Sequence, residues 1–156
     1  MNKTAIIYSD GSCHTQLKIG AWAALLFIEN EKITLQGIEY DTTHNRMELQ
    51  SVIESLKYLQ INYPEYNIVR IISDSQYVVL LRERKQKLIF KNFETKAGKE
   101  IQNIDLVKEL FSLDTYFHIS YEKIKAHQPK IEGVLNFNID VDLIARDLLR
   151  KEIGEQ

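Results

Sequence analysis

The sequence predicts an α/β protein whose five-stranded mixed sheet is flanked by helices. Two observations carry this prediction. Three strand-like segments follow one another at the N-terminus with only short polar turns between them, which is typical of antiparallel pairing. Further along, helical patterns alternate with two more strand-like segments, which is typical of parallel pairing. The expected order is strand, strand, strand, helix, strand, helix, helix, strand, helix.

The first three strands are predicted from apolar runs. The first contains Ala5, Ile6 and Ile7 and reaches Asp10-Gly11, a pair that commonly ends a strand in a turn. The second is apolar almost throughout, as in a central strand, and the third alternates in part. Their predicted bounds are residues 3–9, 19–28 and 33–40.

The rest of the chain predicts four helical segments and two strands. Leu49, Val52, Leu56 and Leu59 share one helical face, and Pro64 closes that helix. The β-branched run that follows can pair parallel with the first strand through a right-handed crossover. The later elements are predicted at residues 68–72 (strand), 75–90 (helix), 101–112 (helix), 116–124 (strand) and 138–152 (helix), with a loop at 128–136.

The composition predicts one globular domain over residues 1–156. Apolar residues make up 44% and charged residues 27%, which is ordinary for such a domain. The net charge of −2 excludes a basic field over the whole molecule, so a nucleic-acid surface must be local. The single Cys13 excludes an internal disulfide, and no apolar run has the length of a membrane span or a signal peptide. We therefore expect a cytoplasmic monomer.

Four acidic residues stand where a shared site can form. Asp10 and Asp74 follow two strands that are expected to be parallel neighbours, whose carboxyl ends meet at one sheet edge. Glu48 is predicted in the first turn of the helix after Thr43, on the side of its buried stripe. Asp142 is predicted in the first turn of the last helix. Together these positions predict a cluster of carboxylates.

Each acid also has an ordinary structural interpretation. Glu48 can complete a capping box with Asn45, and Asp74 can cap the helix that follows it. Asp142 can complement a helix dipole, and Asp10 can be a turn residue. These alternatives stay open for each residue taken alone, and the convergence of all four is what favours a site.

Clustered carboxylates stay ionised only with cations between them, because like charges raise each other's pKa. Oxygen ligands favour Mg²⁺, with Mn²⁺ as a substitute, whereas Cys13, His14 and His127 lack a zinc-ligand spacing. Four carboxylates suit two ions about 3.5–4 Å apart, the arrangement for in-line displacement at phosphorus. The sequence therefore predicts a site for two divalent ions.

Six short motifs make the chain resemble type 1 ribonuclease H over nearly its whole length. Their order and spacing, rather than any single motif, carry the resemblance. The motifs are Tyr8-Ser9-Asp10-Gly11-Ser12-Cys13, Thr42-Thr43-His44-Asn45-Arg46-Met47-Glu48-Leu49, Ser73-Asp74-Ser75-Gln76-Tyr77-Val78, Gln102-Asn103-Ile104-Asp105-Leu106, Ala126-His127 and Asp142-Leu143-Ile144-Ala145-Arg146.

The resemblance implies a ribonuclease H-like fold and an endonuclease that acts on RNA–DNA hybrids. It implies hydrolysis of the RNA strand by two-metal-ion catalysis, leaving 5′-phosphate and 3′-hydroxyl ends. By resemblance, Asp10, Glu48, Asp74 and Asp142 bind the two ions. The same resemblance gives His127 a role in proton transfer or product release.

The resemblance also implies contacts to the hybrid. Backbone groups after the first acid read 2′-hydroxyls, and side chains reaching the minor groove help tell RNA from DNA. Two of the residues, Thr43 and Asn103, have helix capping as an equal alternative to holding a DNA phosphate. The implied substrate-binding residues are Gly11, Ser12, Cys13, Gln16, Thr43, His44, Asn45, Gln76, Arg84, Lys85, Lys87 and Asn103.

Residues 82–99 form a basic segment, with seven Lys or Arg against two Glu. They occupy the position of the family's basic protrusion, which grips the DNA strand. The chain departs from the family in this segment, which lacks tryptophan, and at residues 14–19, which replace a glycine-rich loop. Two alternatives therefore stand beside the main prediction: a catalytically weak hybrid-binding module of the same fold, and the ribonuclease H domain of a reverse transcriptase-like protein.

Overall fold

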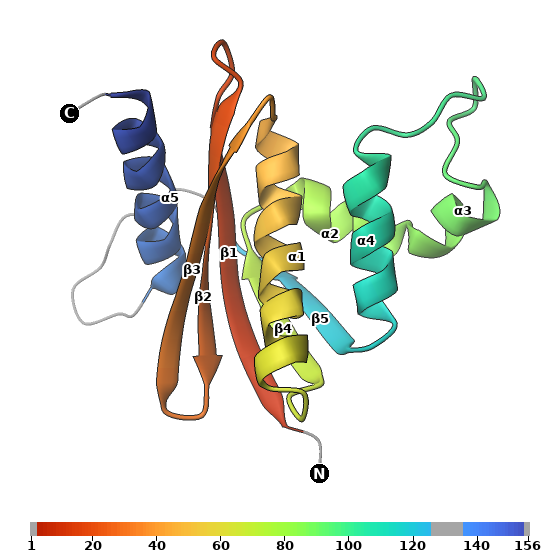
Figure 1. Ribbon diagram of the computed structural model, residues 1–156. Helices are drawn as coiled ribbons and strands as arrows, with labels where there is room; N and C mark the ends of the chain where they lie inside the picture. The colour runs from red at the N-terminus through yellow and green to blue at the C-terminus, as the bar shows by residue number, and fades with distance from the viewer. Residues whose placement is uncertain (1–2, 126–135, 155–156) are drawn as a thin grey trace.

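The computed structural model of the protein describes residues 3–125 and 136–154. The elements follow the predicted order, except that one predicted helix is divided in two. The strands are β1 (Thr4–His14), β2 (Ile19–Ile28), β3 (Glu31–Tyr40), β4 (Ile68–Ser73) and β5 (His118–Lys123), as Figure 1 shows. The helices are α1 (His44–Asn62), α2 (Gln76–Glu83), α3 (Lys85–Phe90), α4 (Ile104–Asp114) and α5 (Phe137–Ile153).

The five strands form one mixed sheet in the order β3-β2-β1-β4-β5. β1, β2 and β3 pair antiparallel. β4 pairs parallel with both β1 and β5. This confirms the predicted sheet, and it places β1 at the centre, with the antiparallel half on one side and the parallel half on the other.

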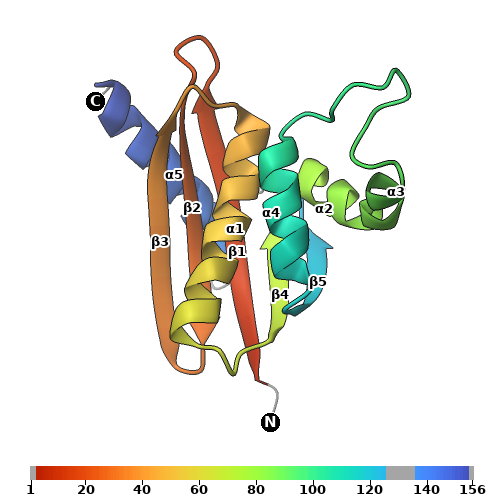
Figure 2. The same cartoon turned by 45° about the vertical axis from the view of Figure 1, so that its right-hand side comes forward.

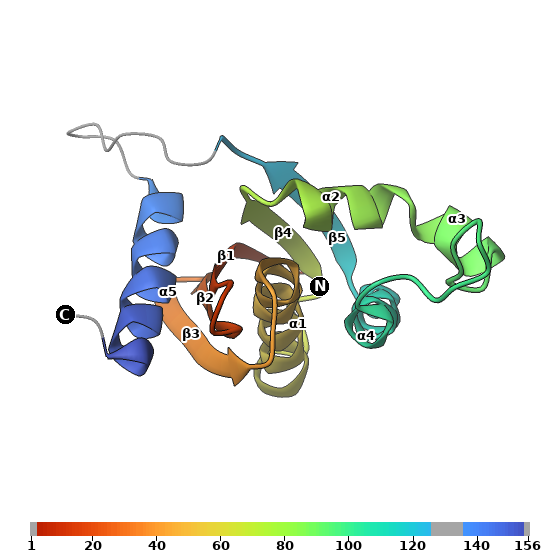
Figure 3. The same cartoon turned by 90° about the horizontal axis from the view of Figure 1, so that it is seen from above.

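Helices cover both faces of the sheet, with α5 on one face and α1 and α4 on the other (Figure 3). β2 shows how the sequence accommodates this. Ala24 and Leu26 belong to the larger core beneath α1, whereas Ala23 and Leu25 belong to the smaller core beneath α5. Because both faces of β2 are buried, its sequence is apolar throughout instead of alternating.

β1 is longer than the sequence pattern predicted. It continues through Asp10-Gly11 to His14, so Asp10 lies inside a strand and is not a turn residue. The parallel ladder with β4 nevertheless stops at the pair Ser9–Ser73, while the antiparallel ladder with β2 continues to the pair His14–Ile19. Asp10 is thus the first residue of β1 with no partner on the β4 side.

The helices begin and end where their capping residues allow. Thr43 caps α1, its Oγ1 accepting from the backbone N–H of Arg46 at 3.2 Å. Asn136 caps α5 in the same way, accepting from the N–H groups of two residues in the first turn. Counted from these caps, Glu48 and Asp142 stand in the second turns of α1 and α5, so the prediction that they lie in the first turns is wrong.

The predicted helix over residues 75–90 is interrupted at Arg84, which ends α2 and precedes α3. α4 also starts three residues later than predicted, after Asn103 adopts a left-handed backbone conformation with φ of 60°. Figure 2 shows α3 and the residues after it extending beyond the β5 side of the sheet, opposite α5. Within the two described ranges, no helix has the length and apolar character needed to cross a membrane.

Candidate active site

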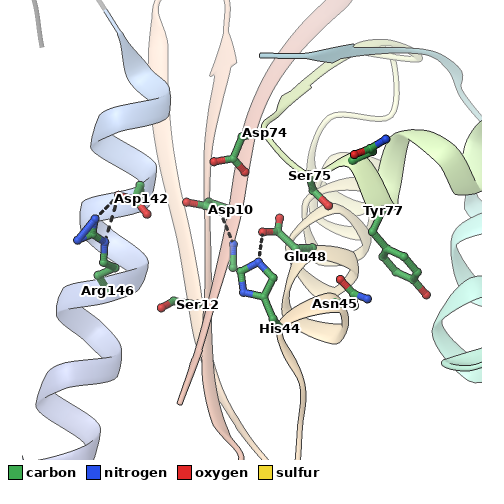
Figure 4. A pocket seen from close by; sticks show the side chains of 12 residues that line it. Asp10, Ser12, His44, Asn45, Glu48, Asp74, Ser75, Tyr77, Asp142 and Arg146 are labelled. Carbon is green, nitrogen blue, oxygen red and sulfur yellow. Dashed lines mark hydrogen bonds and ion pairs between the residues drawn. The ribbon is translucent and has the colours of Figure 1, made fainter. Parts of the chain in front are cut away.

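Three carboxylates from three different elements converge beside the end of β4. Asp10 comes from β1, Glu48 from α1, and Asp74 follows β4 directly. One carboxylate oxygen from each lies within 4.8 Å of the other two (Figure 4). Only 3% of Asp10 and 1% of Glu48 is exposed. Two of the three acids are therefore poorly solvated by water, and Asp74 is half-buried beside them.

The segment after β4 leaves the Asp74 side chain free for this cluster. Ser75, not Asp74, caps α2, its Oγ accepting from the backbone N–H of Val78 at 3.3 Å. The Ser73 hydroxyl oxygen in turn accepts from the Ser75 N–H at 3.0 Å. Two serines thus satisfy the local backbone donors, and the capping interpretation of Asp74 is wrong.

Gly11 allows β1 and α1 to approach closely enough to bring Glu48 to Asp10. A Cβ atom at Gly11 would lie 2.7 Å from the Glu48 backbone nitrogen and 2.7 Å from Met47 atoms. Real Cβ atoms essentially never stand that close to backbone atoms. The Gly11 N–H also donates to Asp10 Oδ1 at 2.8 Å. Sequence reasoning gave Gly11 a contact with RNA and missed this packing role.

The cluster is electrostatically strained as long as no cation neutralises it. Burial raises the pKa of Asp10, and the charges of Glu48 and Asp74 raise it further. Burial also raises the pKa of Glu48, and His44 opposes that shift. Glu48 Oε2 is buried and has no hydrogen-bond partner among the described residues. An all-oxygen donor set with an unpartnered oxygen fits a hard divalent ion such as Mg²⁺ or Mn²⁺.

His44, which the resemblance placed at the substrate, faces Glu48 one helical turn away. Its Nε2 lies 3.1 Å from Glu48 Oε1. Hydrogen bonding to Glu48 raises the pKa of His44, although burial opposes this. The capping box between Glu48 and Asn45 is absent, since Thr43 caps the helix. The spacing of four residues on one helix could have indicated the His44–Glu48 contact from sequence.

A cavity of about 400 Å³ opens over the carboxylates. Asp142 of α5 lies on it, although its carboxylate is not among the three mutually close oxygens. Both Nε and Nη2 of Arg146 lie 3.2 Å from Asp142 Oδ2, an ion pair that sequence reasoning also missed despite its four-residue spacing. The lining consists of Asp10, Gly11, Ser12, His44, Asn45, Glu48, Asp74, Ser75, Gln76, Tyr77, Asp142 and Arg146.

Several residues that the resemblance assigned to substrate lie away from this cavity. The Cys13 thiol faces the Thr42 carbonyl at 3.8 Å, and Gln16 is exposed in the turn between β1 and β2. Asn103 makes no helix cap. Its Nδ2 donates to the Tyr77 hydroxyl at 3.0 Å, and its Oδ1 accepts from Arg46 at 3.4 Å. Asn103 thus joins the start of α1 to α2.

The basic segment is less uniform than its sequence. Lys85 donates to Asp114 Oδ2 at 2.7 Å, and Arg82 Nε lies 3.5 Å from Asp114 Oδ1. The Asp114 side chain is only 4% exposed, so Lys85 is committed to a buried carboxylate instead of facing solvent. Arg84 and Lys87, by contrast, are exposed. Of the three basic residues that were expected at the substrate, two remain accessible.

The predicted contribution of His127 falls on a residue outside the described ranges. The same holds for nearly all of the loop predicted at residues 128–136. The four acids, the residues that line the cavity and the basic segment all lie within the described ranges.

The chain is similar to known ribonucleases H along nearly its whole length. The ribonuclease H family model matches residues 2–150. A ribonuclease H from Caldicellulosiruptor saccharolyticus is 35% identical over 153 residues, covering 96% of this chain and 98% of that protein. A ribonuclease H from Ehrlichia canis is 33% identical over 154 residues, covering 97% of each.

A solved structure agrees at the level of the fold. It is described as LC9-RNase H1, a type 1 RNase H with the type 2 active-site motif. It matches with a TM-score of 0.81 at 20% identity, covering 97% of this chain and 74% of that one. This confirms the ribonuclease H-like fold expected from the sequence motifs. With the family model matched from residue 2 to residue 150, the chain belongs to the ribonuclease H family of nucleases.

Proposed function

We propose that this protein is an endonuclease that hydrolyses the RNA strand of RNA–DNA hybrids with two divalent ions, leaving 5′-phosphate and 3′-hydroxyl ends. Family membership supports the substrate class. The observation that carries the metal-dependent mechanism is the buried cluster of Asp10, Glu48 and Asp74, with its unpartnered Glu48 oxygen. Buried acids that serve only stability are normally paired.

The four acids would hold two Mg²⁺ ions, with Mn²⁺ able to substitute. When bound, the ions would activate water and stabilise the leaving oxygen of an in-line displacement. Asp10 belongs to the close cluster with Glu48 and Asp74 and lines the same cavity as Asp142, so we assign it to both ions. Glu48 would contribute one oxygen to an ion and stand near an RNA 2′-hydroxyl.

The hybrid would lie across the cavity. Gly11 and Ser12 line it and would present backbone groups to the RNA strand, while Asn45 and Gln76 would reach the minor groove. The exposed basic side chains of Arg84 and Lys87 would meet phosphates of the DNA strand. Cys13, Gln16, Thr43 and Asn103, which do not line the cavity, would act further along the hybrid.

Other parts of the proposal rest on sequence reasoning. They are the role of His127 in proton transfer or product release, a single domain over residues 1–156, a monomeric state and a cytoplasmic location.

The deciding experiment incubates the protein with an end-labelled RNA–DNA hybrid while Mg²⁺ or Mn²⁺ is titrated. We expect internal cleavage of the RNA strand, loss of cleavage in a chelator, and products with 5′-phosphate and 3′-hydroxyl ends. Duplex DNA and duplex RNA serve as controls. Tight binding of the hybrid without cleavage in either metal would favour a binding module, and equal cleavage of duplex DNA would contradict recognition of 2′-hydroxyls.

A further inference from the structure

We propose that His44 is a positioning residue for Glu48. It holds Oε1 of that carboxylate so that Oε2 is the oxygen left to bind a metal ion. The inference rests on the metal site of the proposed function. It gives His44 a role other than contact with the hybrid.

The geometry of α1 fixes both residues. His44 is the first residue of α1 and Glu48 stands one turn later, so their side chains share a face of the helix. Thr43 caps this turn, which keeps the backbone of His44 in place. Figure 4 shows the imidazole beneath the Glu48 carboxylate, where Nε2 lies 3.1 Å from Oε1.

The two oxygens of Glu48 are in different environments. Oε1 is contacted by His44, whereas Oε2 is buried without a partner in the described part of the chain. The terminal torsion of a glutamate is broad and roughly two-fold, so a carboxylate without a partner is poorly fixed in rotation. A contact to one oxygen fixes the plane of the carboxylate and thereby the direction in which the other oxygen points.

His44 acts through Glu48 and does not join the ligands. It lines the cavity, yet it is not among the residues whose ligand atoms lie within 4.8 Å of one another. Its contact requires only a hydrogen on Nε2, which the protonated ring and one neutral tautomer both supply. Hydrogen-bonded partners of this kind orient metal-binding carboxylates in many proteins.

The test compares His44→Leu, which removes the donor at similar volume, with His44→Gln, which retains an N–H at similar reach. Mn²⁺ binding to the protein without hybrid is followed by electron paramagnetic resonance at one fixed pH. We expect His44→Leu to weaken Mn²⁺ binding about tenfold or more, and His44→Gln to stay within about threefold of the original protein.

Asn45→Ala is the matched control, because Asn45 adjoins His44 on the same cavity wall, and in the described part of the chain its side chain has no hydrogen bond to Glu48. It should leave the Mn²⁺ affinity unchanged and raise KM for the hybrid. His44→Leu should instead raise the metal concentration needed for half-maximal cleavage, and saturating metal should restore most of kcat.

Three results would overturn the proposal. Unchanged or tighter Mn²⁺ binding in His44→Leu would mean that the imidazole is neutral toward the ion or competes with it. Equal weakening in both variants would exclude the donor as the cause. A nitrogen hyperfine coupling of bound Mn²⁺ that disappears in His44→Leu would make His44 a direct ligand. Because binding is measured without hybrid, failure to cleave RNA would count against the proposed function alone.

Discussion

Two groups of buried acids in this molecule differ in what neutralises them. Asp114, at the end of α4, is paired with Lys85 and Arg82 from the helices that pack over it. Asp10 and Glu48 are also buried, yet in the described residues no Lys or Arg pairs with either, and His44 is the one ion-pair partner of Glu48. Burial alone therefore does not distinguish an acid that the protein's own cationic side chains neutralise from an acid that is suited to bind a metal ion.

The difference follows from the place of each group in the fold. Asp114 lies beneath long basic side chains, whose flexible stems reach a carboxylate and exclude water from it. The three clustered acids meet where β4 has ended, and they face a cavity instead of a covering helix. The first arrangement is closed with the protein's own cations, and the second leaves room for cations and substrate.

The largest expected effect concerns the acids that face the cavity, Asp10, Glu48 and Asp74. Asp74→Asn removes the charge of the least buried of the three acids, which we propose as a metal ligand. Losing about 4 kcal/mol of transition-state stabilisation corresponds to a roughly thousandfold fall in kcat. Single-turnover cleavage of a hybrid at saturating Mg²⁺ measures this, with circular dichroism to show that the fold is intact. A loss under about tenfold would remove Asp74 from the metal site.

The next effect concerns Asp114, the buried acid that is paired with Lys85 and Arg82. Lys85→Met leaves the buried Asp114 with Arg82 alone, and breaking a buried ion pair in this way costs about 3 kcal/mol of unfolding free energy. Urea unfolding measures it. Lys87→Met is the control, because an exposed lysine should change stability by less than about 0.5 kcal/mol. If both variants lose the same stability, Lys85 is not held as the structure shows.

A third prediction concerns how the stability of the metal-free protein depends on pH through Asp10. The pKa of Asp10 is raised in the folded protein, so the folded state binds its proton more tightly than the unfolded state. Stability without metal therefore falls as pH rises above the unfolded pKa of about 4. In a chelator, Asp10→Asn should be more stable than the original protein by on the order of 2 kcal/mol at about pH 8.

That advantage should shrink toward zero as the pH falls below about 4, where the carboxyl is protonated in both states. Thermal unfolding across the pH range measures it. Added Mg²⁺ should stabilise the original protein and leave the variant nearly unchanged. An Asp10→Asn variant that is less stable at every pH would mean that the Asp10 charge already has a partner.

The smallest effect concerns hybrid binding. Lys87→Ala should weaken binding and lower the slope of log affinity against log salt by about 1, because one phosphate contact is lost. Lys85→Ala, measured under conditions where it remains folded, should leave that slope nearly unchanged, because Lys85 already binds Asp114. Fluorescence anisotropy of a labelled hybrid, in buffer without Mg²⁺, measures the salt dependence of binding for both variants. Equal slopes would place the two lysines in the same environment.

Much of the fold was predictable because its signals are local. The apolar run of β2 and the helical stripe of α1 identified the elements, and their order led to the mixed sheet. The convergence of Asp10 and Asp74 was predicted for a partly wrong reason. The sequence placed Asp10 at the end of its strand, whereas it is β4 that ends there and β1 that continues.

What the sequence did not reveal depends on neighbours distant along the chain. Lys85 reads as one more basic residue until α4 brings Asp114 beneath it, 29 residues away. Asn103 reads as a cap or a phosphate contact until α2 supplies the Tyr77 hydroxyl. The His44–Glu48 and Asp142–Arg146 contacts, by contrast, each join residues four apart on one helix, and helical spacing alone could have found them.

Gly11 affects the distance between two of the clustered carboxylates. The spacing between the Asp10 and Glu48 carboxylates depends on how deeply a helix backbone settles against a strand backbone, and the missing Cβ of Gly11 defines that depth. Gly11→Ala would push the two elements apart and widen the gap between the Asp10 and Glu48 carboxylates, although every acid would remain. A residue without a side chain thus sets the spacing of the carboxylates that we propose as metal ligands.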